Sequence, residues 1–301
     1  DGAFYGCKNL DVTATDKPFL EDVQYMHNMF YGCKNLKNTN GSINTWDVSN
    51  VTYMQSMFYG DSLFNQPLNN WNTEKVTSMN GMFQNAASFN QPLSWNTSKV
   101  TDMGNMFYGA KAFNQPLSFN TSSVTSMGNM FYDAVSFNSP LNFTNTSKVQ
   151  WMYGMFYNDS AFNQPINFNT SEVRSMSSMF GNAASFNQPV NFTNTSKVEQ
   201  MSSMFAGAKV FNQPLYFNII SVQDMSSMFQ GAKKFNSPLN FTYSLNSRLK
   251  STRNMFFEAN DFNQPLYFNT DSVVDMSYMF YNDTMFNQPV NFNTSQVRGM
   301  Y

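Results

Sequence analysis

Apolar and polar positions follow one repeating pattern along the chain. An apolar residue is followed three positions later by Met, and a Met-Phe pair comes three positions after that, as in segment 124–131. A second phrase, Phe-Asn-Gln-Pro-Leu, returns in step with the first, and its Phe recurs every 24, 25 or 27 residues from Phe64 to Phe286. Self-similarity at a period of about 20–50 residues is typical of stacked repeats. The pattern therefore predicts a repeat protein.

The first phrase predicts a short helix. In one copy Val124, Met127, Met130, Phe131 and Ala134 fall within an arc of about 120° at the helical step of about 100° per residue. At the period of a strand they would scatter over both faces. Thr and Ser precede the Val and suit a helix N-cap, while Gly or Asp near the Ala suits the helix end. We therefore expect a helix of two to three turns in each repeat.

The second phrase predicts a turn and a short strand. Pro116 excludes a helix interior and biases Gln115 toward extended geometry, while Leu117 and Phe119 alternate as on one face of a strand. Stacked units of this kind would share one core. The expected fold is an α/β repeat solenoid, leucine-rich-repeat-like, with one short strand and one short helix per 24–25-residue repeat and about twelve rungs. Strands stack at about 4.8 Å and helices at about 8–10 Å, so we expect curvature.

The expected domain organisation is one continuous repeat solenoid over residues 1–301, with both ends lying within a repeat. An asparagine follows the Phe of the second phrase in every copy. A buried amide there could bridge the backbone groups of successive rungs, which must be satisfied. We predict a structural, inward ladder, and the alternative is a polar stripe that binds a ligand. The ladder residues are Asn65, Asn90, Asn114, Asn138, Asn163, Asn187, Asn212, Asn236, Asn263 and Asn287.

The two cysteines, Cys7 and Cys33, occupy equivalent positions in adjacent repeats. They could form a disulfide if their Cα atoms come within about 7 Å, and two buried free thiols are the equal alternative. Asn-x-Ser/Thr sequons would be glycan acceptors in a secreted eukaryotic chain. Many sequons belong to the turn before the predicted helix, so the repeat alone explains their number. The candidate glycosylation sites are Asn40, Asn50, Asn96, Asn120, Asn142, Asn145, Asn158, Asn169, Asn191, Asn194, Asn240, Asn282 and Asn293.

Charge and chemistry narrow the function. Only 12% of the 301 residues are charged and the net charge is −2, which disfavours nucleic acid as a partner. No apolar run approaches the roughly 18 residues that span a bilayer. Arg248, Lys250 and Arg253 form the one basic cluster, either a docking patch for an acidic partner or a tolerated insertion at an exposed turn. His27 is the only histidine and no cluster has zinc spacing, so we predict no enzyme and no cofactor.

The run Ser-x-Val-x-x-Met-x-x-Met-Phe-x-x-Ala-x-x-Phe-Asn-Gln-Pro-Leu-x-x-Trp/Phe is clear at 75–95 and 99–119. It resembles the BspA-type surface-protein repeat of mycoplasmas and other microbes. Segment 2–10 is similar to the related treponemal-type leucine-rich repeat. The resemblance covers essentially the whole chain. It implies a leucine-rich-repeat-like solenoid that is secreted or anchored at the cell surface and mediates adhesion to matrix, host or neighbouring cells.

The expected function is thus that of a non-enzymatic extracellular or cell-surface protein that mediates adhesion or binds a protein or glycan. We expect the strand side to be the contact face, with Gln115, Ser118 and their equivalents. Tyrosines after the Met-Phe pair could add aromatic contacts or pack along the helix ends; they are Tyr108, Tyr132, Tyr157 and Tyr281. The alternative is a structural subunit of a filament built by end-to-end stacking of copies. A further idea is ice binding by the threonines at 97, 121, 146, 170 and 195.

Overall fold

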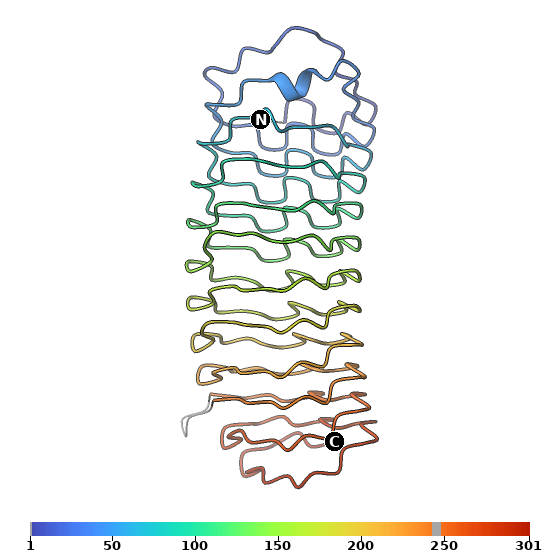
Figure 1. Cartoon of the computed structure of the whole chain (residues 1–301), viewed down its shortest axis with the longest axis vertical. Helices are drawn as coiled ribbons and strands as arrows, with labels where there is room; N and C mark the ends of the chain where they lie inside the picture. Colours follow the sequence, from blue (N-terminus) through green and yellow to red (C-terminus); the bar gives the residue numbers. More distant parts are fainter. Residues whose placement is uncertain (1, 243–247) are drawn as a thin grey trace. The chain divides into compact units, whose positions relative to one another are not determined.

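The computed structural model describes residues 2–242 and 248–301. The chain forms two compact units, Asp1–Thr146 and Ser147–Tyr301, which we call unit 1 and unit 2. Within each unit taken by itself, every repeat makes one coil that lies against the coil before it (Figure 1). A single continuous array over both units stays a prediction.

The predicted helix and strand of each repeat are wrong. Among the described residues the only helix is the 3-10 helix η1, Ser42–Thr45, and no extended strand is present. Neighbouring coils are joined instead by isolated parallel bridges, such as Ser78↔Asp102 in unit 1 and Gln200↔Asp224 in unit 2. The chain is therefore not a leucine-rich-repeat-like α/β solenoid. The expected curvature required helices on one side of the coils, and the described residues contain no such helices.

Two residues per coil with left-handed backbone prevent the helix. Ser56 has φ 52° and Gly60 has φ 73°, and in a later coil Ser203 has 56° and Gly207 has 69°. The equivalent two positions have positive φ in the other coils, and Gly, Asn or Ser fills most of them. A right-handed helix requires negative φ at every residue, and Gly and Asn leave that region most readily. The first phrase therefore folds as a series of turns.

Backbone hydrogen bonds in this segment alternate between two kinds of partner. Ser56, Phe58 and Gly60 donate their N–H groups to carbonyls of the next coil, with N–O distances of 2.9, 2.9 and 2.7 Å. The intervening Met57 and Tyr59 donate to carbonyls three residues back, at 3.3 and 3.2 Å. Every second amide thus connects one coil to the next, and the others close local turns. This division satisfies the backbone without a helix or a regular sheet.

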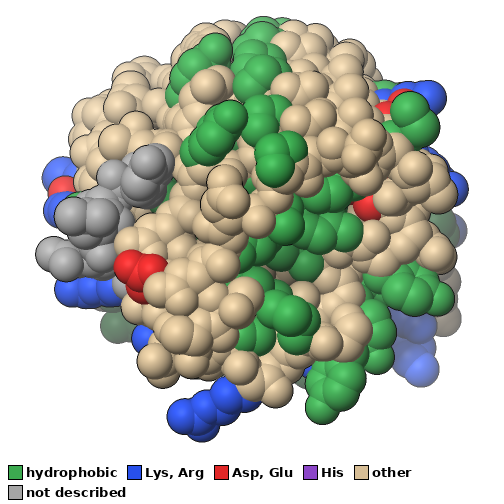
Figure 2. Space-filling model, turned by 90° about the horizontal axis from the view of Figure 1, so that it is seen from below, with side chains coloured by type: hydrophobic (Ala, Val, Ile, Leu, Met, Phe, Trp, Pro, Cys, Tyr) green, Lys and Arg blue, Asp and Glu red, His purple; other side chains and the backbone are tan. Residues whose placement is uncertain are grey.

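The inward residues are those that the apolar pattern predicts. The Val, the two Met and the Phe of the first phrase and the Phe of the second are buried in nearly every coil. Phe107 stacks on Phe83 and Phe131 of the adjacent coils at 5.7 and 5.6 Å, and it lies 4.0 Å from Phe113 of its own coil. Figure 2, which looks at the end carrying the last coils, shows apolar side chains at the centre and polar atoms around them. The predicted core residues are therefore confirmed.

The threonine of each Asn-Thr-Ser turn connects coils and does not cap a helix. Thr97 is fully buried, and its hydroxyl donates to the Asn120 carbonyl of the next coil at 3.0 Å. The local turn is closed by Asn96, whose Oδ1 accepts from the Ser98 N–H at 3.1 Å. The equivalent threonines at 121, 146, 170 and 195 are buried as well. Because this column does not face solvent, the ice-binding hypothesis is wrong.

Candidate interaction surface

The asparagines that follow the second Phe are bonded from coil to coil. The Asn90 N–H donates to Asn65 Oδ1 at 2.9 Å, and Gln115 Nε2 adds a bond to Asn90 Oδ1 at 3.1 Å. These side chains are exposed or partly exposed, so they lie along the surface and not inside the core. The same backbone-to-Oδ1 bond, at 2.8 or 2.9 Å, is made by Asn114, Asn138, Asn187, Asn212, Asn236, Asn263 and Asn287.

The two cysteines are free thiols, Cys7 exposed and Cys33 buried. Cys33 Sγ donates to the Phe4 carbonyl at 2.9 Å. Burial, assisted by the nearby Asp61 carboxyl, raises the pKa of the Cys33 thiol to about 12 and keeps it protonated. A disulfide between the two stays a prediction.

The sequon asparagines are all exposed or partly exposed. Several of them hold the local turn through Oδ1, as Asn120 and Asn169 do by accepting from the N–H two residues on at 3.1 Å. This bond occupies the amide oxygen and not the nitrogen to which a glycan would be attached. Their glycosylation stays a prediction.

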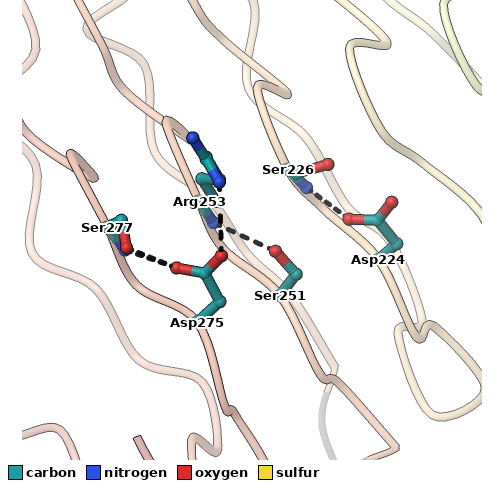
Figure 3. Close-up of polar contacts among 6 residues, drawn as sticks. All are labelled: Asp224, Ser226, Ser251, Arg253, Asp275 and Ser277. Atoms are coloured by element: carbon teal, nitrogen blue, oxygen red, sulfur yellow. Dashed lines mark hydrogen bonds and ion pairs between the residues drawn. The ribbon is translucent and has the colours of Figure 1, made fainter. Parts of the chain in front are cut away.

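Part of the basic cluster is engaged by the next coil. Arg253 Nη1 lies 3.9 Å from Asp275 Oδ2, and the Arg253 N–H donates to Ser251 Oγ at 3.3 Å (Figure 3). Asp275 Oδ1 also accepts from the Ser277 N–H and hydroxyl, at 2.9 and 2.6 Å. Arg248 is exposed and follows residues 243–247, which lie outside the described part of the chain. An acidic partner would therefore compete with Asp275 for Arg253.

The four tyrosines predicted as contacts follow the Met-Phe pair of their coils, and neighbouring coils provide stacking or hydrogen-bond partners for them. Tyr108 and Tyr132 stack on each other with ring centroids 4.6 Å apart, and both are only partly exposed. The Tyr157 hydroxyl accepts from Asn182 Nδ2 at 3.2 Å. Tyr281 is exposed and its ring lies 4.9 Å from that of Phe257 on the preceding coil. Stacking within the column thus accounts for most of this set.

Other aromatic side chains stand at outward positions that neighbouring coils give to small polar residues. Trp151 and Tyr153 are 40% and 39% exposed, and their equivalents in the next coil are Ser175 and Ser177. In unit 1 the Tyr25 and Tyr53 rings stack at 5.1 Å and line a surface hollow of about 360 Å³ with His27.

Tyr216 and Tyr267 are two of the most exposed aromatic side chains among the described residues, at 70% and 68%. They occupy the position of Ser118, on the side of the coil predicted to make contacts. Aromatic residues of this kind were not singled out by the sequence reasoning, although their departure from Ser or Asn in the repeat was visible.

The family comparison agrees with the repeated geometry. The model of a family described as "Mycoplasma protein of unknown function, DUF285" matches residues 1–117, 93–168, 166–266 and 245–301. The chain belongs to this family. Searches of the curated proteins and of the solved structures return no match. The tandem matches show a DUF285 repeat protein, and the family description assigns it no activity.

Two buried carboxyl groups interrupt the DUF285 repeat. Asp61 and Asp159 stand at the inward position that Ala86 and Ala110 occupy in other coils, and both are fully buried. None of their carboxyl oxygens has a hydrogen-bond partner among the described residues. Burial raises the pKa of Asp61 to about 8 and that of Asp159 to about 9, and nearby backbone amides offset only part of this. Sequence reasoning missed both, although an Asp in a column of Ala is a visible signal.

The DUF285 coils bring together no recognisable reaction centre in the described part of the chain. Residues 2–242 and 248–301 contain no group of three or more His, Cys, Asp or Glu side chains placed to hold a metal ion. In the same residues the structure has no helix with the length and hydrophobicity needed to cross a bilayer. The absence of enzymatic activity and of a cofactor stays a prediction.

Proposed function

We propose that this chain is a non-enzymatic extracellular or cell-surface protein with repeats of the BspA type, which mediates adhesion by binding protein or glycan ligands. The observation that carries the proposal is the placement of large aromatic side chains at outward positions. Tyr216 is 70% exposed where the adjacent coils have Asn191 and Asn240. Tyrosine and tryptophan are enriched at binding sites because they offer a large apolar area with a polar end.

The division between constant inward and variable outward positions supports the same proposal. One inward position is Met at 54, 79, 103 and 127, whereas the outward position before it holds Tyr53, Ser78, Asp102 and Ser126. A stack whose coils are hydrogen-bonded to one another holds such outward side chains in fixed register. Repeat arrays use extended surfaces of this kind to bind large partners. The low charge of the chain favours partners recognised by aromatic and amide groups and disfavours nucleic acid.

The binding test uses the whole chain. Immobilised fibronectin, laminin and collagen and an array of neutral and sulfated oligosaccharides would be probed with the native chain. A matched variant would replace Trp151, Tyr216 and Tyr267 by the Ser or Asn of their neighbouring coils. Retention of at least one probe by the native chain, and its loss in the variant, is the expected result. Failure of the native chain to retain any probe would overturn the proposal.

The proposed location at the cell surface and the alternative assembly into a filament are tested by separate measurements. Protease added to intact native cells should cleave the chain if it lies at the surface, and full protection would contradict that location. Assembly of copies into a filament stays a prediction from the sequence. Light scattering of the isolated chain tests it, since a mass that grows with concentration is expected of a filament and a constant monomer mass contradicts it.

A further inference from the structure

One face of unit 2 carries two tyrosine rings that stack on no other ring, and the two coils that hold them are separated by one further coil. Tyr216 lies between the buried residues Leu215 and Phe217, so its side chain points away from the core. Tyr267 lies in the same way between Leu266 and Phe268. No aromatic ring of the described residues stacks on either tyrosine ring. Most of each side chain is therefore open to a ligand, at 70% exposed for Tyr216 and 68% for Tyr267.

The register of the coils places these rings in one column. Leu215 and Leu239 form a parallel bridge, and the Asn240 N–H donates to the Leu215 carbonyl at 2.8 Å. The ring of Phe241 lies 6.5 Å from that of Phe268 on the following coil. Asn240 consequently stands between the two tyrosines. The two tyrosines lie two coils apart, and at about 4.8 Å per coil their positions are separated by roughly 10 Å.

The three segments that form the column carry no charged side chain. Segments 211–218, 235–242 and 262–269 contain no Asp, Glu, Lys, Arg or His, and their outward side chains are Asn, Gln, Ser, Thr, Pro and Tyr. A surface hollow of about 430 Å³ lies beside Tyr267, with Asn269 and Asn291 in its lining, and its one charged lining residue, Asp271, accepts a hydrogen bond from Asn293 Nδ2 at 2.7 Å. This volume is within the range of about 300–1,000 Å³ found for small-ligand sites.

We propose that Tyr216, Asn240 and Tyr267 form a binding site for an extended, neutral glycan chain. This inference rests on the proposed binding function and names its ligand class. An aromatic ring packs against the C–H face of a sugar ring, and the amide of Asn240 can donate to and accept from hydroxyl groups. Two such rings separated by two coils fit alternate sugar rings of one chain. A neutral ligand displaces water from no charged group on the three segments.

A proline-rich peptide is the competing ligand that aromatic surfaces also recognise. Such peptides dock in continuous aromatic grooves, whereas here a polar amide separates the two rings. An acidic or sulfated glycan would find no cation among the three segments. The geometry therefore favours the neutral glycan over both.

The test uses the full chain produced without N-glycosylation and checked by intact mass, because Asn240 is itself a sequon residue. Probes are an array of neutral oligosaccharides, the sulfated and sialylated members of the same array, and decaproline. Tyr216→Asn and Tyr267→Asn, alone and together, copy the residue of the neighbouring coils. Tyr5→Gln is the matched control, because Tyr5 is an exposed tyrosine of unit 1 whose ring stacks on Tyr31 and whose equivalent in a later coil is Gln84.

We expect neutral glycans to bind the native chain and the Tyr5→Gln control equally. Each single variant at the site should bind them more weakly, and the double variant at least tenfold more weakly. Unchanged glycan binding in the double variant would overturn this site while leaving the binding function intact. Binding of decaproline or only of charged glycans would overturn the ligand class. No binding to any glycan, peptide or matrix protein would overturn the site and the proposed function together.

Discussion

Replacing Asp159 by Ala should stabilise unit 2 and reduce the pH dependence of its stability. The carboxyl group is fully buried at a position where the next coil has Ala183, which is equally buried. Neither carboxyl oxygen has a hydrogen-bond partner among the described residues. A buried polar group without a partner is destabilising, whereas Ala already fits the equivalent site. The substitution thus removes an unfavourable group and leaves the packing of the repeat unchanged.

The magnitude follows from the pKa of Asp159. Burial raises it from 3.8 to about 9, and the backbone amides of Ala161 and Phe162 lower it by less. Between these two values the folded state keeps a proton that the unfolded chain has lost, so the stability of the folded state falls as the pH rises. Each pH unit corresponds to about 1.4 kcal/mol, and pH 7 lies about three units above the unfolded pKa. The free energy of unfolding should therefore fall by about 4 kcal/mol between pH 4 and pH 7 because of this one group.

Urea unfolding at pH 4.5, 6 and 7.5 measures this effect. The signal is the fluorescence of Trp151, the only tryptophan of unit 2, in a background in which Trp46, Trp71 and Trp95 of unit 1 are replaced by Phe. Asp159→Ala should unfold at a higher urea concentration than the native chain at pH 7.5, and the difference should shrink toward pH 4.5. Asp159→Asn, which keeps the size but cannot ionise, should also weaken the pH dependence. Ala183→Asp is the reverse control and should destabilise most at high pH.

Two results would refute this reasoning. If Asp159→Ala lowered the urea midpoint at every pH, the side chain would be supporting the fold. If the variant differed from the native chain by the same amount at all three pH values, the carboxyl would be ionising equally in the folded and unfolded states. Either result would mean that Asp159 is solvated or paired in solution.

Two further predictions test the backbone and the core. Met130→Asp should destabilise unit 1 by several kcal/mol in thermal unfolding, because it places a charge in the core. Ser126→Asp, on the outward side, should be nearly neutral in the same measurement. Equal tolerance at the two positions would contradict the assignment of Met130 to the core. Ser203 has φ 56°. Ser203→Gly should change the free energy of unfolding little, whereas Ser203→Val should lower it by about 1–2 kcal/mol, because a branched residue is strained in left-handed backbone and Gly is not. In a helix the Val variant would be more stable than the Gly variant, so the urea midpoints of these two variants distinguish the turns from a helix.

The core could be predicted from the sequence although the helix was wrong. Val124, Met127 and Met130 recur every third residue, and this spacing places side chains on one side of a helix. A series of turns closed by bonds between residues three apart has nearly the same period, as Met130 bonds to Met127 in the structure. The two backbones therefore share one apolar pattern. Periodicity alone identifies which side chains point inward and does not distinguish these backbones.

The signal for the turns was present in the polar residues. Asn129 and Asp133 both have positive φ, and the equivalent residues in the coil before, Asn105 and Gly109, do as well. In one copy such residues suit the solvent face of a helix. Aligned over all copies, two positions four apart that hold mostly Gly, Asn or Ser indicate left-handed backbone. The polarity of these residues suits the solvent face of a helix, and only their backbone preference indicates the turns.

The candidate site depended on information that lies between coils. Tyr216 and Tyr267 share a face because Leu215 bridges Leu239 in parallel register, and the sequence does not state which turns lie side by side. The choice of the contact side was nevertheless made from alternation within one copy, at Ser118 and its equivalents. Local alternation gives the direction of a side chain, and only the stacking gives its neighbours.

The stack imposes different demands on inward and outward positions, and this separates two kinds of departure from the repeat. An inward change such as Asp159 enters the core and alters the free energy of unfolding. An outward change such as Tyr216 leaves the core unchanged, because its neighbours Leu215 and Phe217 stay buried and the adjacent coils carry Asn at the same position. Stability and binding should therefore respond to different substitutions. Asp159→Ala should alter unfolding but not ligand binding, and Tyr216→Asn should do the opposite, since the ligand contacts the surface that the core only supports.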